Sequence, residues 1–402
     1  MYNEINTQKW RFWPVILLSS FYTINASLIM LGIPILFFQK GTSIEIIGFL
    51  SAAQIIAYCF SPLVFNKVSD RLGRKKSLII AMVGTSFSQI TYYLVLEPFV
   101  FLIARFTEGL FLGFFAPNLQ ASISDNPILD HSKYLSRLSL SFNSGSLVGL
   151  LFGALFLLFI NDIILIFYVA PLLIIANAII AIIFFQESTK LTINSGIIES
   201  AQIYEINSGF NNSNKSNELV YHIPVLIPII FLFGFSFAIG SANFIYPIKS
   251  EILGFQSSSA YFLSFVAMFA QTFSVYKASL WSIKRLKVAS LISITLVALI
   301  IIFFGINDHF YGFIILFVLI GIFAGILYGS AIKFFIILNL TKQTSKYSSI
   351  MESLSGITYF VTQITAGLIG GLSLELAFYT LSIILIFISI LYFLSMKRIK
   401  EI

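Results

Sequence analysis

The chain has 402 residues, of which 58% are hydrophobic and only 10% are charged, and its mean hydropathy is +0.95. About a quarter of the residues of a soluble domain are charged, so this composition excludes a water-soluble protein and predicts an all-α protein embedded in a lipid bilayer. The net charge of +7 does not indicate nucleic-acid binding, because the basic residues are spread over short loops between apolar segments.

Twelve apolar segments are long enough to be transmembrane helices, because each crossing of about 30 Å of hydrocarbon needs about 20 apolar residues. In chain order they cover residues 12–38, 44–66, 77–96, 98–120, 136–160, 163–186, 223–247, 255–280, 288–306, 310–338, 347–372 and 374–396. A polar stretch separates the sixth segment from the seventh. We expect residues 1–186 to form one six-helix bundle, residues 187–221 a cytoplasmic linker and residues 222–402 a second six-helix bundle.

The two sets of six segments carry an internal repeat. A shift of about 210 residues aligns Pro14 with Pro224, Arg74 with Arg285, Lys76 with Lys287, Gly109 with Gly321, and Ser144-Gly145 with Ser355-Gly356. A constant offset over several segment pairs indicates two pseudo-symmetric, parallel bundles. In such proteins the bundles rock about a central site.

The distribution of positive charge predicts the orientation in the membrane. The loops that follow even-numbered segments hold most of the basic residues, namely Lys67, Arg71, Arg74, Lys75, Lys76, Lys133, Arg137, Lys190, Lys215, Lys284, Arg285, Lys287, Lys342 and Lys346. The odd-numbered loops hold only Lys40 and Lys249. Short basic loops stay on the cytoplasmic side. We therefore expect a multi-pass protein of the cell membrane with both termini in the cytoplasm.

The loop after the second segment has an unusual composition. A topology signal alone would explain its cations, but not an acid at Asp70 or a turn-forming glycine at Gly73. Asp70, Arg71, Gly73, Arg74 and Lys75 resemble the Gly-x-x-x-Asp-Arg-x-Gly-Arg-Arg/Lys motif of the major facilitator superfamily, with Asn66 in place of the first glycine.

This resemblance implies a transporter fold of twelve helices and a cytoplasmic latch in this loop. In the family, the acid meets the N-terminal end of the eleventh helix, where the helix dipole favours negative charge. The arginines pair with an acid at the inner end of the fourth helix, for which Asp125 is the candidate here.

The fourth segment contains a second motif that is similar to the family pattern Arg-x-x-Gln-Gly-x-x-x-Gly. Arg105, Gly109 and Gly113 match it, while Glu108 replaces the glutamine. Charges within a membrane are costly and indicate function by default, and Glu108 is the only carboxylate in the middle of a predicted span. We expect Glu108 to exchange a proton while Arg105 tunes its acidity. The alternative is an ion pair that only holds the bundle together.

The fifth segment carries glycines at every fourth position, Gly145, Gly149 and Gly153. Together with Gly109 and Gly113 they predict close helix packing. The run also resembles the Gly-x-x-x-Gly-Pro-x-x-Gly-Gly motif of proton-linked exporters of drugs and metabolites. Leu150 replaces the proline and Ala154 the last glycine, which weakens the implied antiport.

Polar side chains at mid-span depth are candidates for the substrate cavity, although some such groups only bond neighbouring helices. They are Tyr22, Asn25, Asn143, Asn243, Gln271 and Gln363. The sequence contains no metal-ligand cluster and no phosphate-binding loop, so we expect neither an enzyme nor a cofactor.

We interpret the chain as a monomeric secondary active transporter that moves a small solute by alternating access, with proton-coupled efflux as the leading mode. Its expected partners are the solute, protons and the bilayer. Alternatives are a sugar or organic-acid importer or facilitator of the same fold, and a non-transporting membrane sensor.

Overall fold

The structure is a computed structural model that describes residues 11–94, 97–125, 131–187, 221–342, 346–396 and 400–401. The predicted linker, residues 187–221, lies almost entirely outside the described residues. Long apolar segments become helices because a bilayer offers no partners for backbone N–H and C=O groups, and a helix satisfies these groups within one segment.

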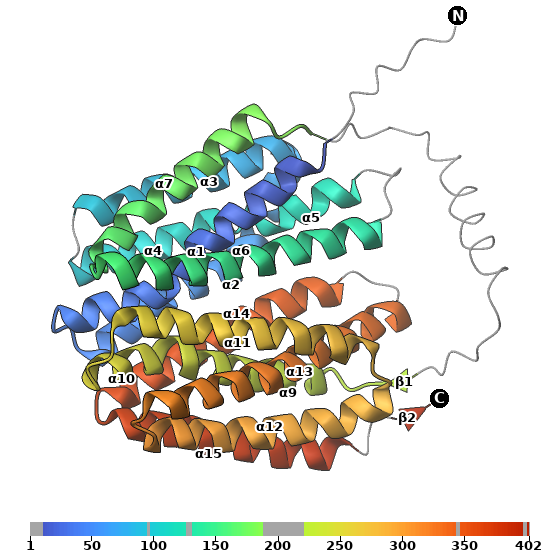
Figure 1. Ribbon diagram of the computed structural model, residues 1–402. Helices are drawn as coiled ribbons and strands as arrows, with labels where there is room; N and C mark the ends of the chain where they lie inside the picture. The colour runs from blue at the N-terminus through green and yellow to red at the C-terminus, as the bar shows by residue number, and fades with distance from the viewer. Residues whose placement is uncertain are drawn as a thin grey trace, which may run out of the picture.

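The first half of the chain forms six helical spans (Figure 1). Its helices are α1 (Trp13–Gln39), α2 (Ile44–Leu72), α3 (Arg74–Leu94), α4 (Pro98–Leu112), α5 (Ala116–Ser124), α6 (His131–Ile160) and α7 (Ile164–Ile183). Helices α4 and α5 form one span that is interrupted at Gly113, where the backbone tightens into a turn before Pro117.

The second half repeats this count. Its first span consists of α9 (Leu226–Gly240), the π-helical turn η1 (Ser241–Ile245) and α10 (Tyr246–Ile252). The others are α11 (Ser257–Leu280), α12 (Ile283–Ile306), α13 (Phe310–Lys342), α14 (Lys346–Gly370) and α15 (Leu374–Ser395). Two two-residue strands, β1 (Tyr221–His222) and β2 (Lys400–Glu401), pair where this half begins and ends.

Ten spans in the described part of the chain are long and apolar enough to cross a membrane. The two remaining helices, α3 and α14, are more polar, but α3 packs on α4 and α7, and α14 packs on α2 and α9. Large apolar side chains also project from the outer surface, with Phe87 72% and Phe159 82% exposed. Such a surface is stable only against lipid, and the predicted all-α membrane fold is confirmed.

Glycines set the distance between helices in both halves. A Cβ atom on Gly109 of α4 would collide with the backbone of Gln54 on α2, and one on Gly321 of α13 would collide with the backbone of Ala267 on α11. In each half, the bare glycine backbone of the fourth span therefore lies directly against the backbone of the second span. The sequence repeat aligns these same two glycines.

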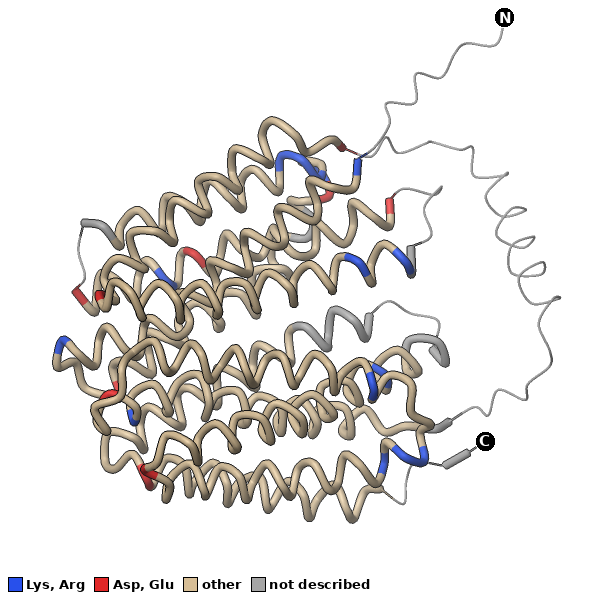
Figure 2. The backbone as a smooth tube through the Cα atoms, viewed as in Figure 1, with Lys and Arg blue, Asp and Glu red and all other residues tan. Residues whose placement is uncertain are grey.

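Charged residues lie mainly at the two ends of the molecule (Figure 2), with most of the cations at one end and most of the acids at the other. One end, here called the basic end, is where α1, α3 and α12 begin and α15 ends, and it carries basic residues such as Arg71, Arg74, Lys75, Arg137 and Arg285. The opposite end, here called the acidic end, carries the acids Glu45, Glu97, Asp162, Glu251, Asp308 and Glu375.

The two halves meet closely at the acidic end. Gln39 of α1 donates from Nε2 to Glu251 Oε2 at 2.8 Å and to Ser257 Oγ at 3.1 Å. The Tyr261 hydroxyl of α11 donates to the Leu28 carbonyl of α1 at 2.5 Å. Where α2 crosses α14, a Cβ added to Gly48 would lie 2.9 Å from the Gly367 Cα atom. These contacts close the acidic end over the space between the halves.

Candidate functional site

An ion pair lies within the N-terminal half, on α4. Arg105 Nη1 lies 2.6 Å from Glu108 Oε2, and the two side chains are 6% and 2% exposed. Residues three positions apart share a helix face, which lets the side chains meet. A buried pair of this kind is stable only where further hydrogen bonds satisfy its remaining atoms.

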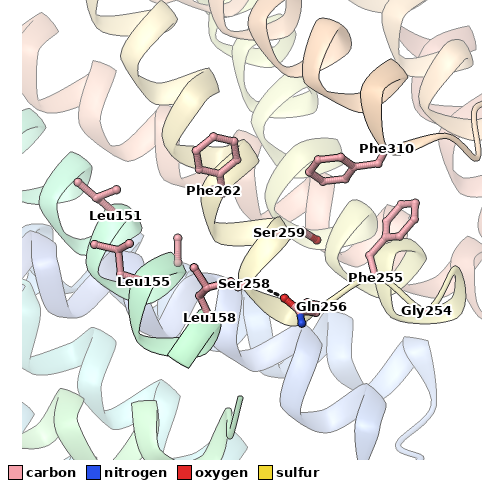
Figure 3. A pocket seen from close by; sticks show the side chains of 11 residues that line it. Leu151, Leu155, Leu158, Gly254, Phe255, Gln256, Ser258, Ser259, Phe262 and Phe310 are labelled. Atoms are coloured by element: carbon pink, nitrogen blue, oxygen red, sulfur yellow. Dashed lines mark hydrogen bonds between the residues drawn. The ribbon is translucent and has the colours of Figure 1, made fainter. Parts of the chain in front are cut away.

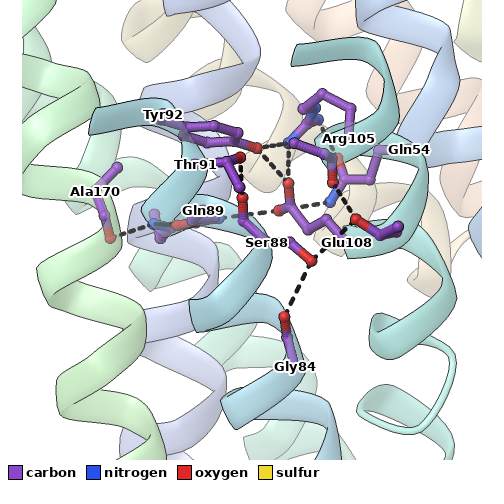
Figure 4. A network of polar contacts seen from close by, with 12 residues as sticks. Gln54, Gly84, Ser88, Gln89, Thr91, Tyr92, Arg105, Glu108 and Ala170 are labelled. Atoms are coloured by element: carbon purple, nitrogen blue, oxygen red, sulfur yellow. Dashed lines mark hydrogen bonds and ion pairs between the residues drawn. The ribbon is translucent and has the colours of Figure 1, made fainter. Parts of the chain in front are cut away.

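Helices α2 and α3 supply further hydrogen bonds to both members of the pair (Figure 4), while Arg105 Nε has no partner among the described residues. Glu108 accepts from the Tyr92 hydroxyl at 2.6 Å, from Gln89 Nε2 at 3.0 Å and from Gln54 Nε2 at 3.1 Å. Gln54 also accepts from Arg105 Nη2 through its Oε1 atom. The carboxylate thus has four donors, including Arg105.

The network continues to α1 and α7. Asn25 and Gln89 exchange two amide hydrogen bonds of 3.0 Å each, and Asn25 Nδ2 donates to the Ala170 carbonyl at 2.5 Å. Asn25 is almost fully buried. The structure therefore places this predicted cavity residue in a bond between helices, the alternative that the sequence left open.

A central cavity of about 340 Å³ lies between the two halves. From the N-terminal half it is lined by α1 and α6, and from the C-terminal half by α9, η1, α11, α13 and α14. The lining residues are Ala26, Ser27, Met30, Asn143, Ser146, Leu150, Phe235, Ile239, Ala242, Asn243, Ser264, Ala267, Met268, Gln271, Tyr328, Ser355 and Tyr359. Its size suits a small molecule.

Three of the six predicted cavity residues, Asn143, Asn243 and Gln271, line this space. The other three lie elsewhere: Asn25 is in the buried network, Tyr22 packs its ring 4.7 Å from that of Phe115, and Gln363 is buried on α14. The direction of each side chain around its helix explains the difference, because a helix presents only one face to the cavity.

A second hollow of about 600 Å³ lies between α6 and α11 toward the acidic end (Figure 3). Leu151, Leu155 and Leu158 lie on one side of it, and Phe262 and Phe310 on the other. The three leucines are also exposed on the outer surface. This apolar lining suits hydrocarbon chains, so the central cavity is the better candidate for a polar solute.

Arg74 is the centre of the polar contacts at the basic end of the N-terminal half. Its Nε atom lies 2.8 Å from Asp125 Oδ2, and its Nη1 atom lies 2.9 Å from Asp70 Oδ1. Its backbone N–H donates to Glu187 Oε1 at 2.6 Å. Gly73 has a φ of +89°, which favours glycine, and it turns the chain sharply between α2 and α3.

These contacts bring together three of the predicted latch residues and join them to α5 and to the segment after α7. Arg71 is exposed and Lys75 is partly exposed. The predicted meeting of Asp70 with the start of the eleventh span involves residues 346–352, for which the structure describes the helical backbone but not the side chains.

The predicted packing glycines lie at close helix contacts. Gly145 and Gly149 of α6 abut Ser20 and Ile24 of α1, while Gly153 abuts Tyr261 of the other half. Gly113 abuts Ser61 of α2. A side chain at any of these positions would push a neighbouring helix away.

Sequence reasoning missed Gln54, Gln89 and Tyr92, which hold the charged pair, and it read Lys249 as a loop residue. For Gln54 and Gln89, the available signal was a polar amide within an apolar segment. Lys249 is buried on α10 and donates from Nζ to the carbonyls of Phe304 at 3.0 Å and Gly305 at 2.7 Å. Within the described ranges, no group of three metal-ligating side chains occurs.

Curated transporters resemble parts of this chain. The Staphyloferrin B transporter of Staphylococcus aureus (strain NCTC 8325 / PS 47) is 25% identical over 156 residues, 37% of each chain. Multidrug resistance protein 2 of Bacillus subtilis (strain 168) is 25% identical over 245 residues, 59% of this chain and 58% of the relative. A gallate transporter of Pseudomonas putida is 28% identical over 117 residues, 29% of this chain and 26% of the relative. The chain thus spans 26% to 58% of the length of these relatives.

Solved structures resemble the whole chain. A POT family transporter in complex with 5-aminolevulinic acid superposes with a TM-score of 0.72 at 13% identity, covering 96% of both chains. A D-xylose–proton symporter superposes with a TM-score of 0.67 at 14% identity, covering 94% of this chain and 95% of that one. At these identities the likeness concerns the fold alone.

The family model described as Major Facilitator Superfamily matches residues 15–339. This match covers most of the chain and agrees with the two groups of six spans around a central cavity. The chain therefore belongs to the major facilitator superfamily.

Proposed function

We propose that the protein is a secondary active transporter of the plasma membrane that exports a small solute in exchange for protons. The observation that carries this proposal is a buried Arg105–Glu108 pair in a bundle that forms one wall of a central cavity. The basic end is the cytoplasmic end in this proposal, because short basic loops are retained inside the cell. Both termini are then cytoplasmic, and the protein acts as a monomer.

Alternating access would come from rocking of residues 1–186 against residues 222–402. Contacts at Gln39, Tyr261, Gly48 and Gly367 close the acidic end. With the basic end in the cytoplasm, as proposed, this conformation would be an inward-facing form. In the outward-facing form these contacts separate, and the Asp70, Arg71 and Arg74 region meets the C-terminal half.

Proton coupling would operate at Glu108. A proton on this carboxylate removes its charge from the ion pair and displaces at least one of the four donors, because a carboxylic acid accepts fewer hydrogen bonds. Fewer hydrogen bonds then join α1, α2, α3, α4 and α7. Among the described residues, no other carboxylate lies in the middle of a span.

Export is supported by the resemblance of the α6 glycines to an exporter motif and by a relative named as a multidrug resistance protein. A second candidate is an uncoupled facilitator or importer. It is favoured by the full set of donors on Glu108 and by the absence of this residue from the lining of the central cavity.

A distance measurement separates these two modes without knowledge of the solute. Spin labels are placed at Ser43→Cys and Ile252→Cys, at the acidic end on opposite halves, in a Cys59→Ser background. Proton coupling predicts two distances by double electron–electron resonance whose populations change with pH. The double variant Arg105→Gln/Glu108→Gln, which lacks both charges, should lose the pH dependence. Unchanged populations across pH 5 to 9 in the starting protein would favour the facilitator.

A further inference from the structure

Gln271 lines the central cavity, and the oxygen of its side-chain amide has no hydrogen-bond donor among the described residues. The residue lies on α11 and is 7% exposed, and its Oε1 atom is buried without a donor from any described residue. A Cβ atom on Gly325 of α13 would lie 2.6 Å from the Gln271 carbonyl oxygen, so close packing fixes this part of α11. A buried acceptor without a partner is costly, which makes a donor on a ligand the natural complement.

The described residues that form the walls around Gln271 carry no formal charge. The seventeen lining residues include no Asp, Glu, Lys, Arg or His. The charged pair at Arg105 and Glu108 is occupied by its own network and does not reach the lining. Moving an ion out of water without a counter-charge is strongly unfavourable. The cavity therefore disfavours both carboxylates and ammonium groups.

Aromatic and sulfur-containing side chains form one part of the wall. The ring of Phe235 stacks on that of Tyr328 with centroids 4.6 Å apart, and it meets the ring of Tyr359 edge-on at 5.8 Å. Met30 and Met268 also line the cavity. Aromatic rings prefer to pack against other rings, and methionines adapt to flat ligands.

We propose that the central cavity binds an uncharged aromatic molecule with an O–H or N–H group that donates to Gln271 Oε1. The inference rests on the proposed function only in treating this cavity as the transport site. It requires neither protons nor a direction of transport. Asn143, Asn243 and Ser264 offer further polar contacts around the bound ring.

Binding of matched compounds to the purified full-length protein tests this proposal. Methyl gallate and nicotinamide are uncharged single-ring molecules with donors, and gallate and nicotinate are their carboxylate counterparts. Isothermal titration calorimetry at pH 7.5 should show at least one uncharged compound binding about tenfold or more tightly than its anion. Equal affinity within each pair, or no binding of either uncharged compound, would overturn the proposal.

Variants on α11 assign the contact. Gln271→Leu should weaken binding of the uncharged compound by about tenfold, the loss expected for one hydrogen bond at a buried site. Thr272→Val is the matched control, because the Thr272 hydroxyl already donates to the Met268 carbonyl of its own helix at 2.8 Å. Gln271→Glu should shift preference toward a cationic analogue such as 3-aminomethylpyridine. Equal affinities in the Gln271→Leu and Thr272→Val variants would show that Gln271 does not bind the compound and would overturn the proposal.

These outcomes are distinct from those of the labelling experiment. A protein with pH-dependent distances but no preference for uncharged rings keeps the proposed transport mode and loses the proposed substrate class. A protein with fixed distances and Gln271-dependent binding keeps the site and loses proton coupling.

Discussion

Arg105 and Glu108 form an ion pair of 2.6 Å, one turn apart on α4, in a position where both side chains are almost completely buried. Gln54, Gln89 and Tyr92 complete the shell of the carboxylate. The pair therefore joins α4 to α2 and α3 by bonds that depend on charge. A proton on Glu108 would remove the charge on which these bonds depend, so the stability of the pair and any proton exchange are linked.

We expect Glu108→Gln to destabilise the protein by about 3–5 kcal/mol, because it leaves the Arg105 charge buried without a counter-charge. The double variant Arg105→Gln/Glu108→Gln should recover most of this loss, since it removes both charges. Thermal unfolding in detergent measures the difference. A double variant less stable than Glu108→Gln alone would contradict the unpaired-charge explanation.

Asp70 and Asp125 both bind Arg74, but their surroundings differ. The Asp70 side chain is 54% exposed and that of Asp125 is 22% exposed. Asp70→Asn should change the free energy of unfolding by at most about 1 kcal/mol, as for surface ion pairs, while slowing transport several-fold if the latch operates. Asp125→Asn should cost more stability.

Two measurements compare the Asp70→Asn and Asp125→Asn variants. One is unfolding in detergent, and the other is the population of each spin-label distance described above, with the rate at which the two populations interconvert. Asp70→Asn should shift those populations toward the form closed at the acidic end, because the proposed latch holds the opposite form. Unchanged populations and rates in Asp70→Asn would remove the latch role of this loop.

Helix α6 packs on α1 through bare backbone at Gly149. An added Cβ would lie 2.7 Å from the Ile24 carbonyl oxygen and 2.9 Å from its Cα atom. Gly149→Ala should therefore cost about 1–3 kcal/mol, the usual penalty for overpacking. Val148→Ala is the matched control, because Val148 is 53% exposed on the same helix. Equal unfolding midpoints in the two variants would show that α1 and α6 adjust without strain.

Lys249 caps the end of α12 from within the protein. The last carbonyls of a helix lack partners in that helix, and a cation there is favourable. Lys249→Met keeps much of the apolar stem but removes both hydrogen bonds to Phe304 and Gly305, so we expect a loss of about 1–3 kcal/mol.

Asp308 is the control for this prediction. It lies 3.1 Å from Lys249 Nζ but is 64% exposed. Asp308→Asn should therefore cost less than about 1 kcal/mol. Thermal unfolding of both variants compares the two contributions, and a larger loss in Asp308→Asn would mean that the surface ion pair dominates.

Sequence reasoning predicted the fold well because the bilayer imposes strong constraints. Apolar runs of spanning length can only be helices or barrel strands, and the motifs near Arg74 and Arg105 identified the family. Local spacing also predicted the meeting of Arg105 with Glu108, since residues three apart share a face.

The composition of the network and of the cavity could not be predicted in the same way. Asn25 and Asn243 are chemically identical and both lie in the first span of their half, yet one bonds Gln89 and the other lines the cavity. A helix that is apolar on all sides carries little signal about which face points inward. Only packing with the other helices decides this.

The contact between Cys59 and Gly356 buries the cysteine between the two halves of the chain. Cys59 is the single cysteine of the sequence, and its sulfur lies on α2 where a Cβ atom on Gly356 of α14 would collide with it. Cys59 is only 3% exposed, so a bulky maleimide can reach its sulfur only where α2 and α14 move apart. Alkylation of the native chain would therefore report separation of these two helices, and Cys59→Ser removes this site from every labelled variant.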